Sequence, residues 1–133
     1  MASGKYSFVI EQGATTDFQI IYKDSAGIPV NLSGYTAAMQ IRNAQGGSTL
    51  YASLTSSLGN VYNKKSGSAF ISLSGSNLST PQISGSIGIY IGHAVTNAFT
   101  FNEAYYDIEI TNGQIRTRLL EGTVKVSKQV TTI

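Results

Sequence analysis

Apolar and polar side chains alternate with a period of two along most of this 133-residue chain. Such alternation is typical of β-strands that bury one face and expose the other. It predicts about eight strands, joined by turns rich in Gly, Asp, Asn and Ser. The expected strands cover residues 5–11, 17–23, 35–43, 49–55, 68–73, 86–92 and the two arms of a closing hairpin within 104–127.

The closing hairpin carries the strongest local signal, because Asn112-Gly113 lies between two strand-like runs. Alternation gives each arm an inner and an outer face. The first arm should bury Tyr106, Ile108 and Ile110, and the second should bury Leu120, Val124 and Val126. Leu119 and Leu120 are adjacent and both apolar, which predicts a bulge or a change of face nearby, at Gly122.

The remaining strands receive their faces in the same way. Inward positions are expected at Phe8, Ile10, Phe18, Ile20, Tyr22, Tyr35, Ala37, Met39, Ile41, Leu50, Ala52, Leu54, Ile87, Ile89 and Ile91. Outward positions include Gln19, Ile21, Lys23, Gln40 and Arg42. One helical turn within 93–99 should pack Val95 and Phe99, and residues 58–67 and 75–84 should be loops.

These elements predict an all-β fold in a single domain spanning residues 1–133. A long hairpin with one apolar face needs a second sheet to cover it. We therefore expect an antiparallel two-sheet sandwich, either immunoglobulin-like or jelly-roll-like, with at most one short helical turn.

Composition excludes several kinds of site. The chain has no cysteine, which rules out disulfides, thiolate metal ligands and cysteine nucleophiles. A net charge of +2 is too small to indicate nucleic acid or an anionic membrane as a partner. The N-terminus lacks the apolar segment of a signal peptide, and no stretch approaches the length of a membrane span. Ordinary export is not expected.

No catalytic, cofactor-binding or metal-binding residue is expected, and the chain is not predicted to be an enzyme. His93 is the only histidine, and we interpret it as a surface or helix-start residue. No serine lies in a Gly-x-Ser-x-Gly turn, and no phosphate-binding loop is present. Asp107 and Glu109 share a strand face and could bind a hard cation or act as paired acids. The favoured interpretation is a solvated face that pairs with Arg116 or Arg118 across the hairpin.

Eight tyrosines without a tryptophan raise the alternative of a surface on which sugars or nucleic-acid bases stack. Tyr22, Tyr35 and Tyr106 fall on apolar faces and are expected in the core. Tyr51, Tyr62, Tyr90 and Tyr105 are expected to be available at the surface. The residues predicted to form an interface are Tyr6, Phe8, Tyr51, Tyr62, Lys64, Lys65 and Tyr90.

Two stretches resemble a group of small bacteriophage structural proteins. The first, FVIEQGATTDFQIIYKDSAGIPVNLSGYTAAMQIRN (8–43), contains a Gly-x-Thr turn, an Asp-x-x-Gly turn, a Pro-Val-Asn-Leu-Ser-Gly-Tyr segment and a strand ending in Ile-Arg. The second, YYDIEITNGQIRTRLLEGTVKVSKQVT (105–131), is similar to that group's closing hairpin. The opening also resembles the N-terminal modules of phage upper-baseplate proteins, which dock receptor-binding proteins to the tail.

The resemblance implies a non-enzymatic virion component, assembled in the host cytoplasm without a cofactor. A tail or baseplate adaptor comes first and a capsid decoration protein second. Partners would be other virion proteins and further copies of the chain, with a trimer favoured. The N-terminal strand is expected to be an interface whose removal, residues 1–11, leaves most of the sandwich folded. A module that binds host-surface glycans and a carboxylate-based hydrolase are the alternatives from other classes.

Overall fold

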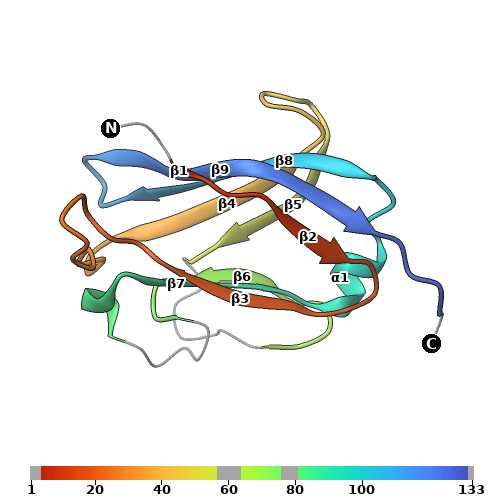
Figure 1. Ribbon diagram of the computed structural model, residues 1–133, viewed down its shortest axis with the longest axis horizontal. Helices are drawn as coiled ribbons and strands as arrows, with labels where there is room; N and C mark the ends of the chain where they lie inside the picture. The colour runs from red at the N-terminus through yellow and green to blue at the C-terminus, as the bar shows by residue number, and fades with distance from the viewer. Residues whose placement is uncertain (1–3, 57–63, 76–80, 132–133) are drawn as a thin grey trace.

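The computed structural model describes residues 4–56, 64–75 and 81–131, and within these ranges the chain forms nine β-strands in two sheets (Figure 1). The strands are β1 (Gly4–Lys5), β2 (Phe8–Glu11), β3 (Thr16–Ile21), β4 (Thr36–Arg42), β5 (Leu50–Thr55), β6 (Ala69–Ser72), β7 (Ser86–Ile91), β8 (Glu103–Thr111) and β9 (Arg116–Ser127). A 3-10 turn, η1 (Gln82–Ser84), precedes β7, and a short helix, α1 (His93–Asn97), follows it. The all-β sandwich is confirmed.

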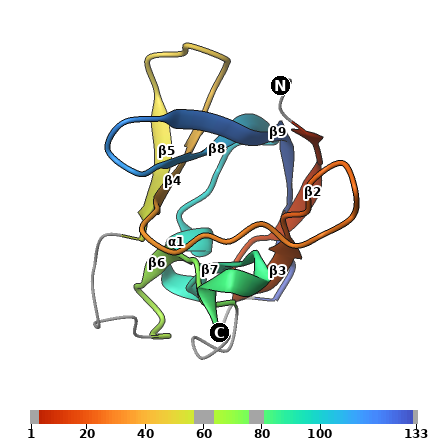
Figure 2. The ribbon, with the colours of Figure 1, turned by 90° about the vertical axis from the view of Figure 1, so that its left-hand side faces the viewer.

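The order of the strands identifies the type of sandwich. The large sheet has the order β1-β9-β8-β4-β5, with β2 also paired to β9, and the small sheet has the order β3-β7-β6. Figure 2 shows the large sheet above the small one. Apart from the placement of the first strands, this is the immunoglobulin-like order and not that of a jelly roll. The named strands pair in antiparallel fashion except at one edge of the large sheet, where β1 and β2 run parallel to β9.

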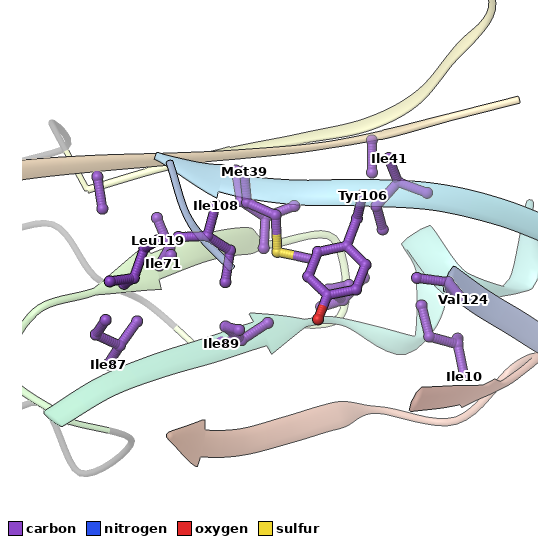
Figure 3. Close-up of a cluster of buried hydrophobic side chains, with 14 of the residues drawn as sticks. Ile10, Met39, Ile41, Ile71, Ile87, Ile89, Tyr106, Ile108, Leu119 and Val124 are labelled. Carbon is purple, nitrogen blue, oxygen red and sulfur yellow. The ribbon is translucent and has the colours of Figure 1, made fainter. Parts of the chain in front are cut away.

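The core between the sheets is almost entirely aliphatic (Figure 3). Met39, Ile41 and Ile108 reach down from the large sheet, and Ile87 and Ile89 reach up from the small one. Burying side chains of this size stabilises each by about 1.5–3 kcal/mol relative to exposure. The predicted inner faces of β4, β7 and β8 are thereby confirmed.

Two bulges change the faces that simple alternation predicts. In the β8–β9 pair the register passes from Ile108↔Leu120 to Glu109↔Arg118, so Leu119 is the additional residue. The bulge expected near this pair is confirmed. Leu119 is buried, whereas Leu120, which was expected on the inner face, is only partly buried. In the β4–β5 pair the register passes from Ile41↔Ala52 to Arg42↔Leu50. Leu50 is consequently exposed instead of lying inside with Ala52 and Leu54.

The predicted helical turn is confirmed as α1, and it anchors the connection between β2 and β3. The hydroxyl of Thr96, fully buried, donates to the carbonyl of Ala14 at 2.8 Å and accepts from the amide of Gly13 at 3.2 Å. The side-chain amide of Gln12 donates to the carbonyl of Phe99 at 2.9 Å. These bonds close the end of the sandwich at which both the N-terminal strand and β7 finish.

Each of the two predicted loops lies only partly within the described residues. Residues 57–63 and 76–80 lie outside the described ranges, and η1 occupies part of the predicted 75–84 loop. Among the residues that are described, no helix is long and apolar enough to cross a membrane.

Candidate functional site

The aromatic residues predicted to be free for an interface are mostly occupied. Tyr90 is only 6% exposed, its ring stacks on Phe70 at 5.2 Å between centroids, and its hydroxyl donates to the carbonyl of Lys65 at 3.0 Å. Its assignment to a surface is wrong, because β7 is the central strand of the small sheet and is buried on both faces. Tyr51 is partly buried and stacks on Phe101 at 4.0 Å. Tyr62 lies outside the described residues.

The predicted basic pair splits into two different environments. The ammonium of Lys64 pairs with the carboxylate of Asp17 on β3 at 2.9 Å and lies 5.9 Å from the ring centroid of Tyr90. Lys65 is exposed, and its backbone carbonyl holds the Tyr90 hydroxyl. Lys64 therefore connects the start of the 64–75 range to β3, an edge strand of the small sheet.

The N-terminal strand is locked onto β9 by backbone contacts around Tyr6. The Tyr6 amide donates to the carbonyl of Glu121 at 3.0 Å, and its own carbonyl accepts from the hydroxyl of Tyr106 at 2.5 Å. The ammonium of Lys5 pairs with the carboxylate of Glu121. Any Cβ at Gly122 would overlap the carbonyl oxygen of Tyr6, so glycine there permits the close approach. Gly122 is thus the position at which β9 lies closest to Tyr6, and the predicted bulge lies at Leu119 instead.

The next strand, β2, is part of the core. Ile10 is fully buried and lies beside Val126 in the sheet register, and Phe8 packs against Phe18 and Tyr106 with ring centroids 5.1 Å from each. Phe8, which was predicted to form an interface, therefore packs mainly against the core. The structure argues against the expectation that removal of residues 1–11 leaves most of the sandwich folded, because the deletion would take away Ile10 and a strand of the large sheet.

A hollow of about 530 Å³ opens between this N-terminal edge and β3. Tyr6 and Leu120 line one side, and Ile20 and Ile21 line the other. Tyr6 is 44% exposed and Ile21 is 50% exposed, which is high for large apolar side chains at the edge of a sheet. We call this feature the edge hollow. Sequence reasoning found Tyr6 and missed Ile21, although an isoleucine between the outward Gln19 and Lys23 was a visible signal.

The outer face of the large sheet holds most of the charge in the chain. Five of the nine basic and five of the seven acidic side chains lie on it or at its edge. These are Lys5, Arg42, Arg116, Arg118 and Lys125 with Glu11, Glu103, Asp107, Glu109 and Glu121. This face is therefore neutral overall, and the net +2 of the chain comes from the small sheet and the loops.

Two adjoining hollows of about 340 and 420 Å³ run along this face and share Gln40, Asp107 and Glu109. Together we call them the outer-face groove. The cross-strand register places Gln40 beside Asp107 and Arg42 beside Tyr105. The β4–β5 hairpin rises above the sheet and supplies one wall through Ala44, Gln45 and Gly46 (Figures 1 and 2).

The charged groups of the groove hold one another in place. Arg118 lies 3.5 Å from the carboxylate of Asp107 and 3.8 Å from that of Glu121, which confirms the predicted cross-strand pairing. Burial raises the pKa of Asp107, the charge of nearby Glu109 raises it further, and Arg118 opposes both. The oxygen of the Gln40 amide accepts from Arg42 at 2.9 and 3.2 Å, and Arg42 also donates to the carbonyl of Gly47 at 3.2 Å.

The groups considered for catalysis are placed as surface residues. His93 is exposed at the start of α1, where the sequence predicted it. Within residues 4–56, 64–75 and 81–131, no three acidic or histidine side chains gather as a metal site would require. The outer-face groove instead combines hydrogen-bonding amides, guanidinium groups and carboxylates, an arrangement suited to binding.

Comparison of the chain with protein-family models finds no match, and comparison with curated proteins finds none either.

Proposed function

We propose that this chain is a non-enzymatic structural component of a bacteriophage particle, an adaptor of the tail or baseplate that assembles through symmetric contacts between copies. Its support begins with the two stretches whose sequences resemble small phage structural proteins. In the fold these stretches are neighbours: residues 8–43 supply β2, β3 and β4, and residues 105–131 supply β9 and nearly all of β8. Four of these five strands lie side by side in the large sheet.

The surface that carries the proposal is the edge hollow. Exposed Tyr6 and Ile21 flank an apolar opening where the edges of both sheets end, and exposed apolar edges of this kind favour contact with another chain. We assign the contact to a second copy of this chain. In a ring of copies the edge hollow would meet a different surface of the next copy, as a heterologous interface requires.

Oligomeric state tests the edge hollow directly. Light scattering after size exclusion should show a defined oligomer for the natural chain and a monomer for Ile21→Glu. Ile28→Glu is the matched control, because Ile28 is 60% exposed but is not among the residues that line the edge hollow. It should remain oligomeric. A natural chain that is monomeric at high concentration, or equal dissociation of both variants, would overturn this assignment.

The location of this chain within purified phage particles tests the virion role. Particles produced from the genome that encodes the chain are separated into heads and tails, and each fraction is analysed by mass spectrometry. Recovery in tails supports the adaptor. Recovery in heads would replace it with capsid decoration, and absence from both fractions would overturn the structural role altogether.

A further inference from the structure

The outer-face groove has the dimensions of a small-ligand site. Its two hollows, of about 340 and 420 Å³, each fall within the range of about 300–1,000 Å³ that is typical of ligand pockets. Short side chains, including Ala38, line part of the groove, and the β4–β5 hairpin forms a raised wall. The groove can therefore hold a slender ligand lying along the sheet more easily than a flat protein surface.

The lining consists of planar groups that hydrogen-bond. The amide of Gln40, the guanidinium of Arg42 and the carboxylates of Asp107 and Glu109 all line it. Each can engage two neighbouring polar atoms of a ligand at once, as donor, acceptor or both. The ion pair of Arg118 with Asp107 and the hydrogen bonds of Arg42 to Gln40 orient three of these groups before any ligand arrives, which lowers the entropy lost on binding.

Two tyrosines complete the lining, and of these Tyr106 is only 4% exposed. Tyr105 is partly exposed at the hairpin end of the groove and lies opposite Arg42 in the sheet register. An aromatic ring presents an apolar face to the C–H groups of a sugar ring, while surrounding polar groups take its hydroxyls. Of the three predicted surface tyrosines that the structure describes, Tyr51, Tyr90 and Tyr105, it is Tyr105 that lines this groove.

Charge indicates which ligand fits. The groove is lined by three arginines, Arg42, Arg116 and Arg118, and by three carboxylates, Asp107, Glu109 and Glu121. It therefore favours a neutral ligand over an anion or a cation.

The lining also argues against a protein partner. Among its described residues, the one aliphatic side chain larger than alanine is that of Ile110, which is 3% exposed and points into the core. A stable protein interface needs apolar or aromatic anchors at its centre and few charges there.

From these observations we infer that the outer-face groove binds a neutral oligosaccharide, with Tyr105 against a sugar ring and Gln40, Arg42, Asp107 and Glu109 on its hydroxyls. The groove shares Arg118 with the edge hollow, but none of the four polar residues proposed to contact the sugar lines that hollow. The inference does not depend on the virion role.

Chemical-shift mapping of the purified chain tests the inference. The probes are maltose, cellobiose, lactose and diacetylchitobiose, each titrated into the millimolar range. At least one should shift the backbone amides of residues 38–46 and 105–109. Tyr105→Ala should weaken that binding by about tenfold, equivalent to about 1.4 kcal/mol. Tyr105→Phe keeps the ring and should bind nearly as well as the natural chain.

Two controls separate the groove from the rest of the sheet. Lys125→Ala changes a charge on the same face outside the groove lining and should leave binding unchanged. Sialyllactose, which adds a negative charge to lactose, should bind no better than lactose. The inference is overturned if no disaccharide shifts the groove amides, if the shifts lie elsewhere, if Tyr105→Ala binds normally, or if the sialylated sugar is preferred.

Discussion

The hydroxyl of Tyr106 donates a 2.5 Å hydrogen bond to the backbone carbonyl of Tyr6, a residue one hundred positions earlier in the chain. Through this bond the central strand β8 contacts the N-terminal segment directly, across the intervening strand β9. Burial of the phenol, with a smaller effect of Tyr6, raises the pKa of Tyr106, so the hydroxyl keeps the proton that it donates.

Replacing this hydroxyl should loosen the N-terminal edge. Tyr106→Phe leaves the ring in the core but removes the donor, so we expect a loss of about 1 kcal/mol in the free energy of unfolding. Urea denaturation measures it. Tyr105→Phe removes a hydroxyl from the neighbouring outward position and should change stability by less than about 0.5 kcal/mol. Equal losses in the two variants would show that the bond to Tyr6 contributes nothing specific.

Gly122 should resist even the smallest side chain. Gly122→Ala places a methyl group against the carbonyl of Tyr6, so β9 and the N-terminal segment must move apart, at a cost of about 1–3 kcal/mol. Thermal unfolding and amide exchange at Tyr6 report the change. Gly67→Ala adds its methyl group to open space and should be neutral or slightly stabilising. Unchanged exchange at Tyr6 in the Gly122 variant would contradict the close approach.

The two neighbouring residues of β2 should differ sharply in their effect on stability. Ile10 is 0% exposed and Val9 is 59% exposed. Ile10→Ala leaves a cavity in the core and should lower the free energy of unfolding by about 2–5 kcal/mol. Val9→Ala should cost less than about 0.5 kcal/mol. Chemical denaturation distinguishes them, and a small effect of Ile10→Ala would restore the view that the N-terminal strand is dispensable.

The carboxylate of Asp107 should make stability fall as the pH rises. Its pKa is raised in the folded chain, so between its ordinary value and the raised one the folded state binds more protons than the unfolded state. This contribution is greatest below that interval and is lost above it. Asp107→Asn should therefore match the natural chain at acidic pH and be more stable than it at pH 7, as denaturation at both pH values would show.

A second variant checks the cause of that shift. Arg118 opposes the rise in the pKa of Asp107, so Arg118→Gln should raise this pKa further in an NMR titration of the carboxyl group. A natural chain that is more stable than Asp107→Asn at pH 7 would mean that attraction to Arg118 outweighs burial and repulsion from Glu109.

Alternation was a sufficient guide wherever a strand keeps a regular register with one buried face. Tyr106, Ile108 and Ile110 were assigned correctly for that reason. At Leu119 and Leu120 the adjacent apolar side chains signalled the bulge that the structure shows, but not which of the two is buried. At Leu50 alternation failed, because the bulge beside it reverses the face on which its side chain lies. It failed at Tyr90 because a central strand can be buried on both faces.

The two candidate surfaces depend on contacts between distant parts of the chain. Gln40 and Asp107 were each predicted to face outward, but only the register of β4 against β8 makes them neighbours. Likewise, turn residues specify which strands follow one another in a hairpin, and they contain no information on the parallel pairing of β2 with β9. Tyr6 and Ile21 line the same hollow because the N-terminal segment lies along β9.

The parallel course of β2 beside β9 also determines how the fold would respond to tension. The chain enters at one end of the sandwich and leaves at the opposite end (Figure 1). Pulling on the two termini would slide these strands along each other, so the backbone bonds between them would be strained together and not opened one after another. The topology therefore gives the molecule its greatest resistance to rupture along the line that joins its ends.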